Sequence, residues 1–220
     1  MSQSKAFPPD PQADCNLCPR LVEFREENKK KFPDFFNGAV GSFGPNDARL
    51  LIIGLAPGLK GANRTGRPFT GDYAGDLLYS CLEQAGLAKG TYDKRPDDGF
   101  ELIDTMITNA VRCVPPQNKP IGEEVNNCRP FLNSRISALK NLKAYLALGK
   151  IAHDTAIRNF GLKLKDYPFG HAKVHELPDG KFLIDSYHCS RYNVNTNRIT
   201  EAMFLDALNL CKEAVYPQIA

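Results

Sequence analysis

A run of four branched apolar residues, Leu50 to Ile53, leads directly into a glycine-rich segment, and this junction constrains the fold more than any other feature of the chain. Such a run is typical of a strand buried on both faces of a parallel sheet, and open α/β sheets bind ligands just beyond the ends of these strands. The junction alone is equally typical of an ordinary α/β turn. The segment continues to Gly75, however, well beyond roughly 12 to 15 residues, and carries arginines, aromatic residues and an acid, which favours a functional loop.

Four of the seven cysteines are spaced like metal ligands. Cys15 and Cys18 form a C-x-x-C pair, and Cys113 and Cys128 are separated by fourteen residues. The odd cysteine count and the lack of a signal-peptide pattern argue against a disulfide framework. We therefore expect one shared metal centre, but spacing alone does not separate a four-cysteine zinc site from an iron–sulfur cluster.

Apolar strand patterns alternate with helical patterns along the chain. The expected strands are residues 49–55, 106–111, 144–148 and 182–184, and the expected helices are residues 20–31, 76–87, 122–142, 151–159 and 200–214. Helical crossovers return each strand to the same direction, so the pattern predicts an α/β three-layer sandwich with a central parallel sheet of about four strands. We expect a single domain over residues 1–220, with residues 1–14 loosely ordered.

Three polar residues follow ends of these strands: Asp72, Asn109 and His188. Carboxyl ends of parallel strands meet at one edge of a sheet, so we expect these side chains to converge there. Each has a plainer interpretation that sequence context leaves open. Asp72 fits a helix N-cap, Asn109 fits a turn residue, and His188 fits a loop histidine bonded to backbone.

Charge and hydropathy restrict the kinds of partner and the cellular location that we expect, but they do not indicate a function. The net charge is +3 and the pI is near 8.4, so nucleic-acid binding would rely on local basic patches. No apolar run approaches the roughly 18 residues that a membrane span needs. These features predict a soluble, cytoplasmic protein with no membrane partner.

Four segments together resemble one known family. Residues 54–58, 64–72, 108–113 and 188–193 are similar to motifs of the iron–sulfur uracil-DNA glycosylases, specifically the type-B or family 5 branch, and the resemblance runs from about Cys15 to Thr200. Family 4 enzymes typically carry glutamate as the second residue of the first motif, whereas this chain has Leu55, as expected for family 5. One departure is Cys189, which stands where the histidine motif usually has proline and so leaves the placement of His188 less constrained.

The resemblance implies a DNA repair enzyme that flips uracil out of DNA and hydrolyses its N-glycosidic bond, leaving an abasic site. It implies Asp72 as the acid in the pocket, which would orient water and oppose positive charge on the sugar, and His188 as a donor to uracil O2. It also implies a [4Fe-4S] cluster on Cys15, Cys18, Cys113 and Cys128, with zinc as the alternative. Hydrolysis transfers no electrons, so the expected role of the centre is a structural clip.

Base recognition and DNA contacts complete the expected site. A carboxamide can face uracil N3–H and O4 together, which suits Asn109, and Phe69 is the candidate stacking surface. The first motif would line the base pocket and supply backbone donors through Gly54, Leu55, Ala56, Pro57 and Gly58. The candidate DNA contacts are Arg191, Tyr192 and Asn193 as a wedge, with Ser190 and Arg198 on phosphates. Because Leu55 is apolar, we also expect hypoxanthine or xanthine to be tolerated.

Two other classes remain open at this point. A non-catalytic iron–sulfur or zinc module that binds nucleic acid would keep Asn109 and Phe69 but would not need Asp72. A nucleoside hydrolase would share the sugar chemistry without the DNA wedge. Release of free uracil from DNA separates these classes, and we expect a monomer acting on uracil-containing or otherwise deaminated DNA.

Overall fold

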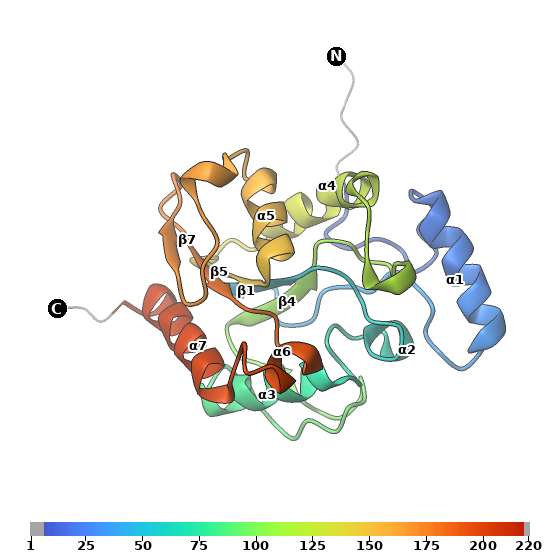
Figure 1. Cartoon of the computed structure of the whole chain (residues 1–220), viewed down its shortest axis with the longest axis horizontal. Coiled ribbons are helices and arrows are strands. Elements are labelled where there is room, and N and C mark those ends of the chain that lie inside the picture. Colours follow the sequence, from blue (N-terminus) through green and yellow to red (C-terminus); the bar gives the residue numbers. More distant parts are fainter. Residues whose placement is uncertain (1–6, 218–220) are drawn as a thin grey trace, which may run out of the picture.

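The computed structural model describes residues 7–217 and centres on a five-stranded sheet. The strands lie in the order β4 (Thr105–Asn109), β1 (Leu50–Gly54), β5 (Ala144–Leu148), β7 (Phe182–Ser186) and β6 (Val174–Glu176), as Figure 1 shows. The first four are parallel, whereas β6 pairs antiparallel with β7. The predicted sheet of about four parallel strands is confirmed, and β6 adds an edge strand that the sequence analysis did not anticipate.

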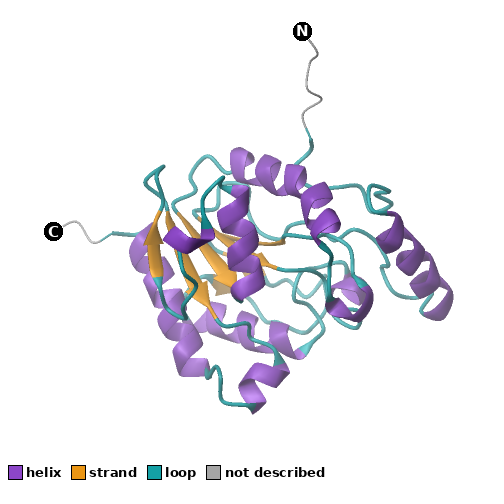
Figure 2. Ribbon diagram, turned by 45° about the horizontal axis from the view of Figure 1, so that its top comes forward, coloured by secondary structure: helices purple, strands orange, loops and turns teal. Residues whose placement is uncertain are grey.

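Alternate side chains of β1 enter two different hydrophobic cores. Leu50 and Ile52 pack with α3 (Tyr73–Gln84) and α7 (Glu201–Val215), and the intervening Leu51 and Ile53 pack on the face covered by α5 (Lys150–Asn159). Both faces of the sheet are therefore covered by helices, with α4 (Gly122–Ala138) on the same side as α5 (Figures 1 and 2). This arrangement confirms the three-layer α/β class and explains why every residue of β1 is apolar or glycine.

The order of the strands places a crevice at the end of β1. The chain leaves β1 for β4 on one side, then returns through α4 to β5 on the other side. Loops after β1 and β5 thus diverge, and a ligand crevice is expected where strand order reverses. The loop between β1 and β4 contains α2 (Ala62–Thr65) and the small ladder of β2 (Ala88–Lys89) with β3 (Glu101–Leu102).

The remaining elements differ from the expected bounds by a few residues. Helix α1 (Pro19–Lys31) lies near the start of the chain, and the short helix α6 (Arg191–Asn195) lies between β7 and α7. Short 3-10 turns occur at Pro116–Asn118 and Leu164–Asp166. The helix expected over residues 122–142 ends at Ala138, where Leu139 leaves helical geometry. The helix expected over residues 76–87 begins earlier, at Tyr73, because Asp72 caps it.

Residues 7–14 differ from the expected loosely ordered segment, while residues 1–6 lie outside the described residues. The Asp10 carboxylate accepts hydrogen bonds from Ser42 and from the guanidinium groups of Arg112 and Arg135. Arg112 is fully buried, so an acid must reach it to balance its charge. That requirement ties the N-terminal arm to the body of the domain.

Among the helices described over residues 7–217, none is long and apolar enough to cross a bilayer.

Candidate active site

A cleft of about 780 Å³ opens at the carboxyl ends of the parallel strands. Its walls come from segments that follow β1, β4, β5 and β7, so four separate loops contribute to one cavity. Both sequence-predicted catalytic residues, Asp72 and His188, lie on its lining, as do Phe69 and Asn109. The predicted convergence of distant motifs at one sheet edge is therefore what the structure contains.

Asn109 ends β4 and presents a buried amide to the cleft. Its side chain is 2% exposed, and its Oδ1 has no hydrogen-bond partner among the described residues. Gly54 lies beside it in the sheet, and a Cβ at Gly54 would collide with this oxygen and come within 2.7 Å of the Phe69 ring. Gly54 itself is not on the cleft lining, so it acts by leaving room for Asn109 and Phe69, while residues 55–58 line the wall directly.

Phe69 holds its ring on the cleft wall through an unusual backbone. Its φ is 52°, a left-handed conformation that non-glycine residues rarely adopt. The ring centroid lies 6.1 Å from that of His188, and the side chain is largely buried. Gly75 passes so close to the Phe69 carbonyl that a Cβ there could not be accommodated.

Asp72 serves two purposes at once. Its Oδ1 accepts a hydrogen bond of 3.1 Å from the Gly75 N–H, which makes it the N-cap of α3. Its Oδ2 faces the turn at Gly58 and Gly61, where a side chain at Gly61 would collide with the carboxylate. The N-cap interpretation is therefore correct, yet the capping residue also lines the cleft and leaves one oxygen turned toward the glycine-rich turn.

His188 lies opposite, on the loop after β7. Burial lowers the pKa of His188, and the negative charge of Asp72 opposes that shift, so the imidazole is neutral near pH 7. Gly149 has a φ of 93°, and a Cβ there would lie 3.3 Å from the His188 Cβ. The Asn193 amide donates to the His188 carbonyl at 2.8 Å, which fixes the backbone of this loop.

Cys189, which stands where the histidine motif usually has proline, restrains the loop of His188 through a side-chain hydrogen bond. Its side chain is fully buried, and its thiol donates to the Ala74 carbonyl in the first turn of α3 at 3.3 Å. This bond links the loop carrying His188 to the helix that Asp72 caps. The loop therefore keeps an attachment to the opposite wall although it lacks proline's fixed φ.

The predicted DNA-contact residues surround the mouth of the cleft in different ways. Tyr192 projects from α6 and is 73% exposed, outside the cleft lining. The guanidinium of Arg191 lies 5.3 Å from the Tyr73 ring, and that of Arg198 lies 4.8 Å from the Tyr187 ring. Ser190 caps α6, with its hydroxyl accepting from the Asn193 N–H.

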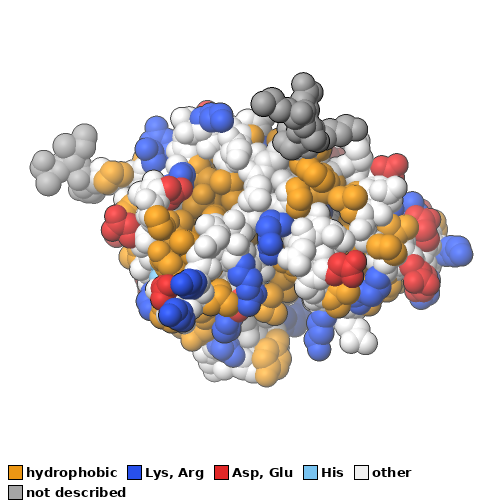
Figure 3. Space-filling model, turned by 90° about the horizontal axis from the view of Figure 1, so that it is seen from above, with side chains coloured by type: hydrophobic (Ala, Val, Ile, Leu, Met, Phe, Trp, Pro, Cys, Tyr) orange, Lys and Arg blue, Asp and Glu red, His pale blue; other side chains and the backbone are white. Residues whose placement is uncertain are grey.

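Other lining residues were not anticipated from the sequence. Gly149 and Lys150 follow β5, and Phe169 and Tyr187 close the wall near His188; Lys60 and Asn118 lie on the cleft as well. A glycine directly after the apolar strand at residues 144–148 is the signal that could have indicated the β5 contribution. In Figure 3, lysine and arginine side chains gather toward the lower centre of the face shown, with hydrophobic side chains between them.

The four predicted metal-ligand cysteines come together in one cluster, outside the cleft lining. Cys15, Cys18, Cys113 and Cys128 belong to one hydrophobic cluster with Leu21 and Val111. Burial raises the pKa of Cys113 to about 12 and that of Cys128 to about 11, so holding these thiols as thiolates here requires a positive partner.

Hydrogen-bond donors and a buried cation surround these cysteines. The Asn127 amide donates to the Cys18 sulfur at 3.7 Å. Arg25 is buried against the arm, where its guanidinium donates to the Cys15 carbonyl at 2.8 Å. The setting thus offers one N–H donor to sulfur in a mostly apolar shell.

A second cluster of titratable side chains lies beside the cleft. The carboxylate of Asp185 is 2.7 Å from Nδ1 of His153 and 3.0 Å from Nε2 of His175, while Nε2 of His153 is 2.8 Å from the Tyr167 carbonyl oxygen. These are hydrogen-bond separations, because two ligands of one zinc ion would lie about 3.3 Å apart. We interpret the cluster as a buried network that joins α5 to the β6–β7 hairpin and supports Phe169, which packs edge-on against His153.

The fold is a mostly parallel sheet with helices on both faces and a cleft at its carboxyl edge. Around the cleft lie a carboxylate, an imidazole, an aromatic ring and an amide whose oxygen has no partner among the described residues. These groups define a class of α/β protein whose site suits a small, planar, polar group. The sequence model of the uracil DNA glycosylase superfamily matches residues 41–212. The chain belongs to this superfamily, and its similarity to type-5 members places it in that branch.

Individual relatives support that placement. The chain is 44% identical to the type-5 uracil-DNA glycosylase of Thermus thermophilus over 199 residues, covering 88% of this chain and 90% of that protein. It is 40% identical to the type-5 uracil-DNA glycosylase of Mycobacterium tuberculosis over 207 residues, covering 90% and 77%. A type-4 uracil-DNA glycosylase of Pyrobaculum aerophilum is 34% identical over 140 residues, covering 63% and 57%.

Proposed function

We propose that this protein is a DNA repair glycosylase that binds uracil flipped out of DNA and hydrolyses its N-glycosidic bond to leave an abasic site. The observation that carries this proposal is the Asn109 amide, which is buried at the cleft with an unpartnered Oδ1. A buried polar atom without a partner is costly, so a ligand that supplies the missing donor is strongly favoured there.

Uracil matches the amide of Asn109 on both sides. Its N3–H can donate to Oδ1, and its O4 can accept from Nδ2. Cytosine presents an unprotonated N3 and an amino group, so both contacts would be repulsive. The Phe69 ring, held beside Asn109, provides the stacking face for the base.

Asp72 and His188 supply the chemistry of bond cleavage. As the bond breaks, positive charge develops on the sugar and negative charge on the base. The Asp72 Oδ2, which faces the turn at Gly58 and Gly61, would orient water and oppose the sugar charge, and the neutral imidazole of His188 would donate toward uracil O2. The lowered pKa of His188 supports this assignment, because a neutral donor near pH 7 avoids placing a full charge next to the base.

The exposed Tyr192 is the candidate wedge that fills the gap left by the flipped nucleotide. The neighbouring Arg191 and Asn193 would support it, and Ser190 and Arg198 would contact phosphates at the cleft mouth. The apolar Leu55 leaves one corner of the pocket without a polar side chain. Hypoxanthine and xanthine are accordingly proposed as further substrates.

The cofactor proposed for the cysteine site is a [4Fe-4S] cluster on Cys15, Cys18, Cys113 and Cys128. A single zinc ion at about 2.3 Å from each sulfur would require sulfurs about 3.8 Å apart. Over residues 7–217 no three of these sulfurs lie within 4.8 Å of one another, which suits a larger centre. The N–H donor that Asn127 offers to the Cys18 sulfur, in a mostly apolar shell, also suits such a cluster.

The bound cluster would supply structural cross-linking and no step of the hydrolysis. It would join the arm before α1 to Cys113, which follows β4, and to Cys128 in α4. Zinc remains the alternative. We further propose that the protein acts as a cytoplasmic monomer.

The test is a single-turnover assay on labelled oligonucleotides that carry one uracil, hypoxanthine, xanthine or cytosine. The expected result is free uracil and an abasic site from the uracil strand, with no cleavage at cytosine. Asp72→Asn should slow the release of uracil by roughly 10²- to 10³-fold, because the neutral amide no longer opposes the sugar charge. Asp34→Asn, which changes an exposed acid near the end of α1, is the matched control.

Binding of uracil-containing DNA without base release would instead favour a non-catalytic nucleic-acid-binding module. Faster reaction with free deoxyuridine than with DNA would favour a nucleoside hydrolase. Either result would contradict the proposed function.

A further inference from the structure

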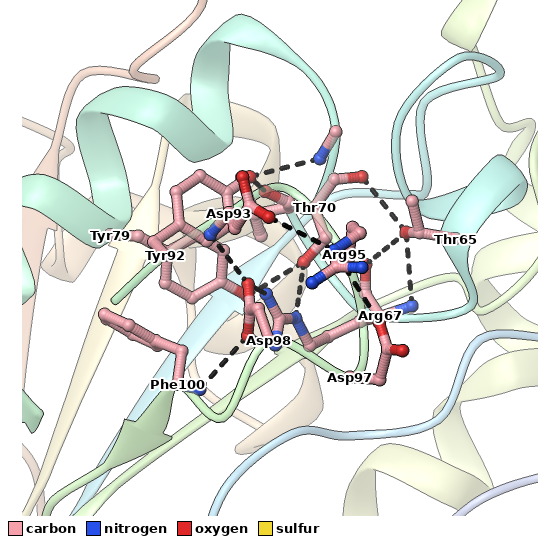
Figure 4. Close-up of polar contacts among 12 residues, drawn as sticks. Thr65, Arg67, Thr70, Tyr79, Tyr92, Asp93, Arg95, Asp97, Asp98 and Phe100 are labelled. Carbon is pink, nitrogen blue, oxygen red and sulfur yellow. Dashed lines mark hydrogen bonds and ion pairs between the residues drawn. The ribbon is translucent and has the colours of Figure 1, made fainter. Parts of the chain in front are cut away.

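The loop that carries Phe69 and Asp72 is held from outside the cleft by a buried polar network, shown in Figure 4. At its centre the Arg67 guanidinium donates to both carboxylate oxygens of Asp98 at 2.8 Å each, and its Nε donates to the Thr70 hydroxyl at 2.8 Å. The side chains of Arg67 and Asp98 are 5% and 0% exposed. Neither residue lines the cleft.

Three aromatic rings enclose the Arg67 guanidinium. Its central carbon lies 4.9 Å from the ring centroid of Phe43, 5.4 Å from that of Tyr79 and 5.7 Å from that of Tyr92. Planar guanidinium groups stack on such faces while forming a two-pronged bond to a carboxylate. The charge is thus fully balanced and the arginine has one well-defined position.

The two tyrosines of this enclosure also bind the loop backbone directly. The Tyr79 hydroxyl donates to the Pro68 carbonyl at 2.6 Å. The Tyr92 hydroxyl accepts from the Gly71 N–H at 3.1 Å and donates to the Phe69 carbonyl at 3.4 Å. Burial raises the pKa of Tyr92 to about 12, so its hydroxyl keeps the proton that this pair of bonds requires.

These bonds surround the strained residue. Phe69 has a φ of 52°, and the hydroxyl of Tyr92 spans from its carbonyl to the Gly71 N–H, one residue before Asp72. A left-handed non-glycine residue persists only where its surroundings hold it. The network therefore sets both the direction of the stacking ring and the start of the helix that Asp72 caps.

We propose that Arg67, Asp98, Tyr79 and Tyr92 are positioning residues for base excision, which fix Phe69 and Asp72 relative to the flipped base without touching it. The inference rests on the proposed function, since it concerns the same cleft. Their removal should slow the chemical step far more than it weakens DNA binding, because misplacement of reacting groups by about 1 Å can cost roughly a hundredfold in rate.

The main test uses Tyr92→Phe, which removes only the hydroxyl and keeps the packed ring. We expect the single-turnover rate on uracil-containing DNA to fall roughly ten- to a hundredfold, with KM within about twofold of the parent. Tyr145→Phe is the matched control, because Tyr145 is also buried but lies in the core on the opposite face of the sheet. Its rate should not change.

A second pair of variants addresses the ion pair, with the active fraction measured by titration. Asp98→Asn should lower the rate, and Asp98→Glu, which keeps the charge, should restore part of it. The double variant of Asp98→Asn with Tyr92→Phe should be slowed less than the product of the two single effects, since both act on one loop. A purely structural role would instead lower the active fraction and the melting temperature while leaving the rate per active site unchanged.

These experiments distinguish failure of the proposed function from failure of the positioning role. If the parent protein releases no base, the proposed function is wrong and the positioning role falls with it. If the parent is active and folded Tyr92→Phe releases uracil at the same rate, the positioning role alone is wrong.

Discussion

Asn109 is the residue on which recognition depends, and its environment explains why. Its amide is buried at the cleft, and its oxygen has no partner among residues 7–217. Gly54 leaves the space that the amide occupies, since any side chain there would displace it. A single strand-end glycine and a single strand-end asparagine on neighbouring strands thus define the polar side of the pocket.

The sequence was sufficient to place these residues but not to describe their bonding. Asp72 followed a glycine-rich loop and preceded a helix, so both the N-cap and the pocket interpretations were reasonable, and the structure combines them. The attachment made by Cys189 could not be predicted, because a thiol bond to Ala74 depends on the packing of α3 against a loop more than a hundred residues away in sequence.

His188 provides a prediction about proton binding. Burial lowers its pKa and Asp72 partly offsets that effect, so we expect a titration midpoint below about 6.5 by NMR of the imidazole. Asp72→Asn should move the midpoint lower still, because it removes the charge that favours the imidazolium. Asp154→Asn, which changes an acid that pairs with the exposed Lys150, is the control and should leave the His188 midpoint unchanged.

The lowered pKa of His188 also makes the free energy of unfolding depend on pH. The unfolded chain binds a proton at His188 more readily than the folded chain, so the free energy of unfolding should fall as pH drops from about 6.5 through the folded-state pKa. A midpoint above 6.5, or one that does not respond to Asp72→Asn, would contradict this account of the site.

At the scale of elements, the apolar patterns in the sequence predicted the four parallel strands but missed the edge strand β6. Strands β1 and β5, in the middle of the sheet, are continuous apolar runs because helices cover both faces. Strand β6 has three residues with only His175 buried, so its pattern was too short to stand out. The turn at Pro178 to Gly180 between β6 and β7 was the available signal for a hairpin.

The cysteine site belongs to this scale because it joins separate elements. We expect the purified protein to contain iron and sulfide and to absorb visible light. Cys15→Ala should lose that absorption and lower the melting temperature, because the arm before α1 is then released from Cys113 after β4 and from Cys128 in α4. Cys81→Ala, which changes a buried cysteine on the core-facing side of α3, is the control and should keep its iron.

Colourless protein with one zinc ion per chain would reject the iron–sulfur assignment. The glycosylase proposal would survive that result, because none of the four cysteines lines the cleft.

At the scale of the whole molecule, the fold brings four strand ends to one cleft and places a different task on each. The end of β1 supplies a glycine wall, β4 the amide, β5 the glycine beside His188, and β7 the imidazole. Supports for these groups lie outside the cleft: the Arg67 network on one side and the buried His153–Asp185–His175 network on the other. Such supports depend on contacts between distant segments, so sequence patterns do not reveal them.

The most direct test of the central claim compares uracil and cytosine excision by the parent protein and by Asn109→Ala, with Asn126→Ala on the exposed face of α4 as the control. The account predicts a preference for uracil of at least about 10⁴-fold in the parent and in the control. In Asn109→Ala it predicts a uracil rate lowered by roughly 10²- to 10³-fold and a much weaker preference. An Asn109→Ala protein that still excises uracil at the parent rate and with the parent preference would contradict it.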